Sequence, residues 1–139
     1  MINRNIMHKE NIHPRDDKII EHISFKGAHV TSLMKTMEGK IVQDADRLDA
    51  LGAIGIARLF SYSGSIGRPI HNPDVKPHLH YSFEDYQINQ TAAINHFYEK
   101  LLLLQDRLNT QTAKKIAQSR HRYMEDFLKR FYAEWDGKM

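Results

Sequence analysis

The sequence predicts an all-α chain of about four to five helices, interrupted by one long loop at residues 61–81. Two observations predict this class. Apolar residues recur at spacings of three and four along most of the chain, which is the period of an amphipathic helix. Glycine and proline gather between residues 61 and 81, where they oppose regular structure.

The N-terminal region is expected to be a flexible tail over residues 1–14, with the folded domain over 15–139. Pro14 suits the start of a helix better than its interior. Ile19, Ile20 and Ile23 then form an apolar stripe, so we expect a short helix over 15–24.

A second helix is expected from about Lys40 to Phe60. Its apolar face repeats at spacings of four, three and four residues, at Ile41, Ala45, Leu48 and Gly52. Gly52 and Gly55 weaken this helix locally, or else they allow another helix to approach it closely.

After the loop, the run Ser82–Asp85 resembles a capping box with Asp in place of Glu, and it predicts a helix over 84–107. The inward positions of that helix and the turn after it are Ala93, Phe97, Leu101, Leu104 and Leu108. Asn109 or Thr110 can cap a last helix that runs toward the C-terminus.

Composition narrows the class of protein. The 139 residues are 41% hydrophobic and include no cysteine, so a packed core is expected and a thiolate metal site is excluded. No apolar run approaches the ~20 residues of a membrane span. A cytoplasmic protein is the simplest interpretation. The net charge of +3 fits an anionic ligand, but acidic residues dilute the basic ones of the last helix, so we do not expect nucleic-acid binding.

The most informative stretch carries four charges within six residues, from Asp44 to Asp49. Asp46 and Asp49 are three residues apart, so they neighbour each other on one helix face and repel unless a cation or a proton intervenes. A bound metal is one answer. The other is salt bridging, for which Arg47 lies three residues from Asp44.

The loop offers two weaker signals. Gly64–Arg68 is a glycine turn with a trailing arginine, and a plain turn is its simpler interpretation. Arg68 and Arg47 are our two candidate arginines for contact with a phosphate group. His78 and His80 are two residues apart beside Pro77, and we expect them to be solvated loop histidines rather than metal ligands.

Several motifs together resemble the HD-domain metal-dependent phosphohydrolases, in particular a bacterial subgroup. The main one is IVQDADRLDALGAIGIARLF at residues 41–60, which is similar to the last signature of that family. The others are IIEHISFKG at 19–27, GRPIHNP at 67–73, INHFYEKLLLL at 94–104 and RHRYMEDFLKRFYAEWDG at 120–137. The resemblance covers nearly everything from residue 15 onward.

The resemblance implies a fold, a metal and an activity. The fold is a helical bundle, and the metal is a divalent ion such as Mn or Mg, held by a histidine, an adjacent His-Asp pair and a distant aspartate. That last ligand corresponds to Asp46, and Asp49 would support it from beside the site. The activity is hydrolysis of a phosphoester or a nucleotide, in which the metal activates water and holds phosphate oxygens.

The chain departs from the family pattern in one respect: none of its nine histidines is followed by aspartate. We therefore expect the C-terminal part of such a phosphohydrolase, with an incomplete metal site, no assignable catalytic residue and no activity on its own. The alternative is a non-catalytic helical remnant or partner-binding module. Both interpretations predict uncovered apolar faces, and so self-association or a partner chain.

Overall fold

The computed structural model describes residues 19–20, 22–88 and 91–138. Within these ranges the chain is helical and has no strand, which confirms the all-α class. Ile19, Ile20, His22 and Ile23 are helical, as expected. The tail predicted over 1–14 lies outside the described residues.

The helix expected over 40–60 is two helices, α2 (Met37–Asp49) and α3 (Gly52–Ser65). Ala50 and Leu51 separate them, and Gly52, the first residue of α3, has a φ of +75°, a conformation that favours glycine. A Cβ on Gly55 would lie 2.1 Å from the carbonyl oxygen of Ala50, so the corner accepts no larger residue there. Periodicity continues through this corner, which is why the sequence alone did not reveal it.

The loop after α3 starts at Ile66, because the helix continues through residues 61–65, which contain no proline. The loop then packs on the start of the next core helix. The backbone amides of Ala93 and Ile94 donate to the carbonyls of Pro69 and Ile70, each at 2.9 Å.

The single helix expected over 84–107 is wrong. The chain forms α4 (Phe83–Ile88), α5 (Ala93–Glu99) and two 3₁₀ turns, η2 (Leu101–Leu103) and η3 (Gln105–Arg107). Lys100 leaves the helical region with φ −144° and ψ −61°, and this ends α5. The capping prediction is confirmed in part, since the Ser82 hydroxyl accepts the amide of Asp85 at 3.0 Å.

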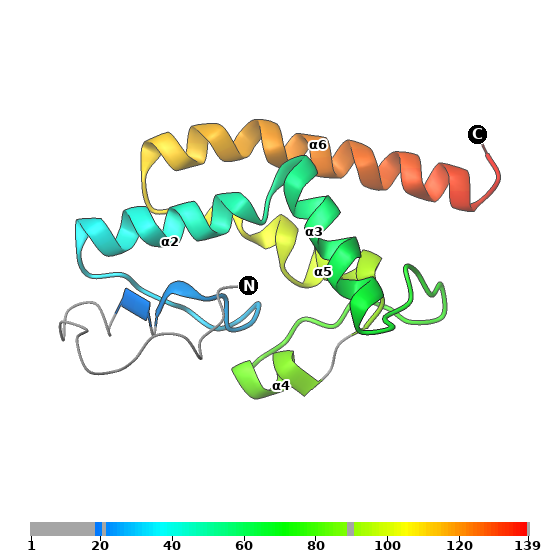
Figure 1. The fold of residues 1–139 in the computed structure, drawn as a ribbon, viewed down its shortest axis with the longest axis horizontal. Helices are drawn as coiled ribbons and strands as arrows, with labels where there is room; N and C mark the ends of the chain where they lie inside the picture. The colour runs from blue at the N-terminus through cyan, green and yellow to red at the C-terminus, as the bar shows by residue number, and fades with distance from the viewer. Residues whose placement is uncertain (1–18, 21, 89–90, 139) are drawn as a thin grey trace.

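The last helix, α6 (Gln111–Trp135), runs along α2 and across α3 (Figure 1). Thr110 caps it by accepting the amide of Ala113 at 3.3 Å. Gly52 lies against α6, where an added Cβ would meet the Arg120 side chain at 3.1 Å. Close approach of a second helix at Gly52 is therefore confirmed.

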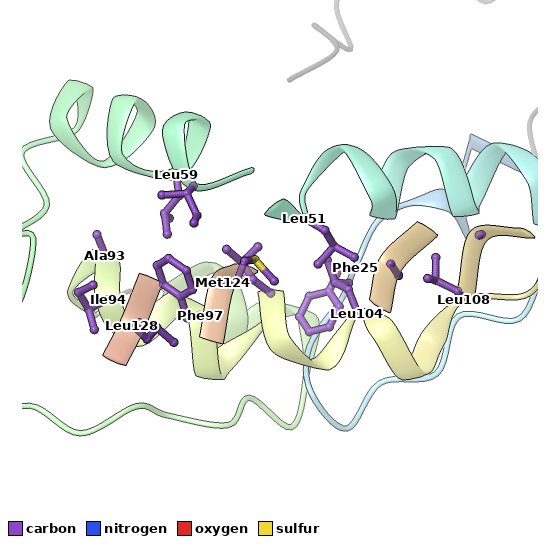
Figure 2. Close-up of a cluster of buried hydrophobic side chains, with 14 residues drawn as sticks. Phe25, Leu51, Leu59, Ala93, Ile94, Phe97, Leu104, Leu108, Met124 and Leu128 are labelled. Atoms are coloured by element: carbon purple, nitrogen blue, oxygen red, sulfur yellow. The ribbon is translucent and has the colours of Figure 1, made fainter. Parts of the chain in front are cut away.

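The core lies between α3, α5, the 3₁₀ turns and α6 (Figure 2). Phe97 is fully buried at its centre and stacks on Phe127 with ring centroids 5.7 Å apart. The five inward positions predicted around α5 are all buried, namely Ala93, Phe97, Leu101, Leu104 and Leu108. This part of the chain has the packing that its sequence pattern predicts.

Candidate functional site

Helix α2 carries Asp46, the predicted metal ligand. An ordinary surface helix buries apolar residues, whereas most of the buried residues of α2 are polar or charged. Its buried residues are Gly39, Gln43, Asp44 and Arg47. Its apolar residues Met37, Ile41 and Val42 are exposed, and so are Asp46 and Asp49. The helix therefore buries a polar face and leaves part of its apolar face exposed.

Hydrogen bonds make that polar face compatible with burial. The Gln43 amide donates to the carbonyls of His22, at 2.8 Å, and Ser32, at 3.2 Å. Its carbonyl oxygen accepts from the side-chain amide of Asn109 at 2.9 Å. Gln43 thus ties α2 both to the segment before it and to the turn before α6.

Asp44 makes the strongest of these links. One carboxylate oxygen accepts the Asn109 amide at 2.7 Å and the other accepts the Thr110 amide at 2.8 Å. Burial by itself raises the pKa of Asp44, but the hydrogen bonds from Asn109 and Thr110 outweigh it and leave that pKa below its ordinary value. Arg47 donates to the carbonyl of Arg107.

Asp46 points to the other side, where it lines a shallow pocket of about 100 Å³. The lining residues come from α2, α3, the segment before α2 and the chain that follows α5: Phe25, Asp46, Arg47, Asp49, Ala50, Arg58, Lys100 and Leu104. Asp49 forms an ion pair with Arg58. Asp46 is therefore the pocket carboxylate that forms no ion pair among the described residues.

Lys100 is the lysine among the lining residues of this pocket. Its ammonium lies 5.6 Å from the centre of the Phe25 ring and 5.9 Å from that of Tyr86. Burial lowers the pKa of Lys100 below its ordinary value, Asp46 opposes that shift and Arg58 adds to it. The pocket thus holds three cationic side chains against two carboxylates, a balance that suits an anion such as a phosphate group.

The residues that line this pocket do not suit the binding of a divalent metal by themselves. A metal site needs several ligands with a fixed geometry, and hard or borderline ions take carboxylate and imidazole groups. The lining includes no histidine, and one of its two carboxylates is already paired with Arg58. Within the described residues, Asp46 stands as a single candidate ligand.

The structure brings together three of the four residues proposed from the sequence. Asp46, Arg47 and Asp49 share the pocket, with Arg47 buried in its floor. Arg68 is not among the lining residues; it lies over the Tyr62 ring, 6.0 Å from its centre. Sequence reasoning missed Arg58 and Lys100, although both fall inside motifs that carry the family resemblance.

Helices α2 and α3, which both line the pocket, carry an uncovered apolar surface among the described residues. Ile41 is 55% exposed, Val42 43% and Ile54 64%. A second, wider hollow shares Asp49 with the pocket. Its lining residues are Asp49, Leu51, Gly52, Ala53, Ile54 and Arg120. Among the described helices, none combines the length and the hydropathy that crossing a bilayer requires.

The all-helical fold is similar to solved structures that include an HD-superfamily hydrolase. An HD-superfamily hydrolase from Bacillus thuringiensis matches 73% of this chain and 47% of its own length, with 51% identity and a TM-score of 0.60. A crystal structure of a Lactobacillus plantarum protein matches 88% of this chain and 58% of its own, with 46% identity and a TM-score of 0.83. These similarities support an HD-like family for the chain.

A curated relative is the uncharacterized protein YpgQ of Bacillus subtilis, 38% identical over 102 residues, which are 73% of this chain and 42% of that protein. Its crystal structure in complex with ADP matches 71% of this chain and 44% of its own, with 39% identity and a TM-score of 0.58. The chain thus spans about half the length of these relatives. No protein-family model matches it.

Proposed function

We propose that this chain contributes one side of the active site of an HD-type metal-dependent phosphohydrolase. The observation that carries the proposal is the exposed Asp46 carboxylate at the rim of a pocket that also holds Arg47, Arg58 and Lys100. In this assignment Asp46 is the last ligand of a divalent metal such as Mn or Mg. Asp49 supports the site through its ion pair with Arg58.

The substrate class is a phosphoester or a nucleotide. A positively charged pocket attracts phosphate oxygens, and buried cations bind them more strongly than exposed ones do. Lys100 and Arg58 are better placed for this than Arg68, because they line the same pocket as Asp46. The ADP complex of YpgQ, which is similar to this chain, supports the nucleotide branch of the proposal.

The remaining metal ligands, a histidine and a His-Asp pair, would come from a second polypeptide segment seated on the apolar surface of α2 and α3. Val42 lies one turn from Asp46 on α2, and Ile54 lines a hollow that shares Asp49 with the pocket, so a segment covering these residues would bring its own side chains toward Asp46. Self-association of the uncovered surface is the expected behaviour of the chain by itself.

The second candidate is a non-catalytic module that binds a partner through the same surface. The exposure of Ile41 and Ile54 favours it as much as it favours the enzyme. The two candidates differ at Asp46 and Lys100. An enzyme needs both side chains, whereas a binding module needs only the apolar residues around them.

A chimaera tests the enzyme. The segment of the Lactobacillus plantarum relative that this chain does not match would be fused ahead of it, or supplied as a separate chain. Hydrolysis of ADP and of a simple phosphoester would be followed with Mn²⁺. We expect no activity from the chain alone, activity from the chimaera, and a loss of about 100-fold or more in Asp46→Asn, since a ligand replacement removes the metal.

Lys100→Met separates phosphate binding from metal binding. We expect kcat/KM to fall by about 10- to 100-fold, as when one charge-assisted contact to phosphate is removed. Arg122→Met on the exposed side of α6 is the matched control and should leave the rate unchanged. A folded chimaera that is inactive, or that keeps its activity in Asp46→Asn, would contradict the enzyme and leave the partner-binding module.

A further inference from the structure

We propose that His78, His80 and Asp85 form a second cation site, for a divalent ion of the zinc class, which shares no residue with the Asp46 pocket and is independent of the proposed hydrolase function. His78 and His80 lie in the loop before α4, and Asp85 lies in its first turn. The candidate ligand atoms of these three residues all lie within 4.8 Å of one another.

The distances suit a tetrahedral ion. Zinc bonds of 2.0–2.2 Å to nitrogen and oxygen place two ligand atoms about 3.3–3.6 Å apart. Asp85 Oδ2 lies 3.2 Å from His78 Nε2 and 3.6 Å from His80 Nδ1. The pair of imidazole nitrogens is separated by at most 4.8 Å, and His78 is half-exposed, so a small rotation of its ring closes the triangle.

His80 provides the independent observation that points to a ligand. The expectation of a solvated loop histidine is wrong for it, because its side chain is 1% exposed. Its Nδ1 is buried and has no hydrogen-bond partner among the described residues. A buried nitrogen without a partner is costly, and it lies on the side of the ring that faces Asp85. A cation between the two groups would remove that cost.

Glu99 lies near the nitrogen of the His80 ring that does not face Asp85. Its Oε2 lies 3.9 Å from His80 Nε2, the nitrogen that the proposed cation would not use. Its other oxygen accepts the backbone amide of His78, at 3.0 Å, and the Thr91 hydroxyl, at 2.6 Å. A carboxylate behind a ligating imidazole orients the ring and strengthens it as a donor. Glu99 therefore positions both histidines without binding the cation.

The donor set selects the kind of ion. Two imidazoles and one carboxylate suit zinc and its neighbours better than calcium or magnesium, which prefer oxygen. His78 is half-exposed, so water would reach such an ion as a fourth ligand. Such an ion would join the loop that carries His78 and His80 to α4, and we infer a structural rather than a catalytic role.

Zinc titration of the full chain tests the site. The chain would first be stripped of metal with a chelator and then titrated calorimetrically, with Co²⁺ as a spectroscopic probe of the geometry. We expect one equivalent of zinc, visible bands typical of tetrahedral cobalt, and zinc-dependent shifts of the His78 and His80 ring signals in NMR spectra. The NMR measurement needs no variant. Shifts confined to other histidines would overturn the proposal.

Surface variants of the ligands complete the test. His78→Gln and Asp85→Asn should each weaken zinc binding by about tenfold or more. Two controls should bind like the wild type. One is Asp46→Asn, which also separates this site from the proposed active site. The other replaces two histidines outside the proposed cluster, near the N-terminus of the sequence, as His8→Gln and His13→Gln. Binding that survives in His78→Gln but is lost in either control would overturn the proposal, as would the absence of stoichiometric zinc.

Discussion

Helices α2 and α6 run side by side, yet they bury opposite kinds of surface (Figure 1). Helix α6 buries Ala113, Ala117, Met124 and Leu128 and exposes its charged residues. Helix α2 buries Gln43, Asp44 and Arg47 and exposes Ile41 and Val42. Both are amphipathic, so the same sequence signal has two outcomes within one small structure.

The difference is that the buried apolar stripe of α6 is covered by other described residues, whereas part of the apolar stripe of α2 is not. An apolar stripe in water gives up the free energy that its burial would contribute, about 25 cal/mol for each Å². The stripe of α6 has core residues against it, whereas the stripe of α2 faces outward beside Asp46. We infer that another surface completes α2, as the proposed function requires.

The largest expected effect separates the two apolar stripes. Leu128→Ala on α6 should lower the free energy of unfolding by about 3 kcal/mol, because the side chain is 4% exposed and leaves a cavity. Ile41→Ala on α2 should change it by less than about 0.5 kcal/mol in the dilute chain. Urea unfolding of both variants measures this. An equal cost at Ile41 would mean that its stripe is already covered.

The polar face of α2 gives the next effect. Asp44→Ala should cost about 2 kcal/mol, since it leaves the amides of Asn109 and Thr110 without an acceptor. Asp46→Ala, two residues away and exposed, should cost less than about 0.5 kcal/mol. The comparison of helices would fail if both substitutions cost the same in urea unfolding.

Acid should weaken the same link. The pKa of folded Asp44 lies below its ordinary value, so the unfolded chain takes up this proton first. The stability from Asp44 is complete above about pH 4, the ordinary range of an aspartate, and is lost as the pH falls toward the pKa of the folded form. Unfolding measured from pH 6 to pH 2 should have a shallower acid limb in Asp44→Asn than in the wild type.

The two helix starts should respond alike. Thr36 accepts the amide of Gly39 at 3.1 Å, and Thr110 accepts that of Ala113 at 3.3 Å. Thr36→Ala and Thr110→Ala should therefore each cost about 1 kcal/mol. Thermal unfolding checks the pair, with Ser replacements as controls that keep the hydroxyl. A clearly smaller cost at Thr36 would mean that the start of α2 is frayed in solution.

The smallest effect on stability should come with the clearest effect on association. Ile54→Lys places a charge on the uncovered surface, where the side chain is 64% exposed, so unfolding should hardly change. Sedimentation of the wild-type chain should detect self-association that this variant reduces. Ile116→Lys, on the exposed side of α6, is the matched control. A wild-type chain that stays monomeric at high concentration would contradict the uncovered surface as an interface.

Much of the fold follows from periodicity, and its failures have identifiable causes. The inward residues around Phe97 and the Thr110 cap were predicted because each depends on local pattern. The corner at Gly52 was missed because the apolar repeat continues across it. Which residues of α2 face outward was not predicted, because a repeat defines a stripe without stating which side the rest of the chain occupies.

The site was predictable to a similar extent. The spacing of Asp46 and Asp49 placed them on one helix face, and the structure puts both in one pocket. Lys100 reaches that pocket from a segment 54 positions beyond Asp46, and no local pattern connects the two. His80 was misjudged because its burial depends on Tyr86 and Glu99, which follow it in the chain.

The hydrogen bonds of Asp44 also determine where Asp46 points. An α-helix turns by about 100° for each residue, so the two side chains lie about 200° apart around the axis of α2. The hydrogen bonds from Asn109 and Thr110 to Asp44 therefore fix the rotation of α2 about its axis. That rotation determines the outward direction of the Asp46 side chain. A substitution at Asp44, which lies outside the pocket, should therefore redirect Asp46 without touching it, and under the proposed function it would weaken a metal ligand from a distance.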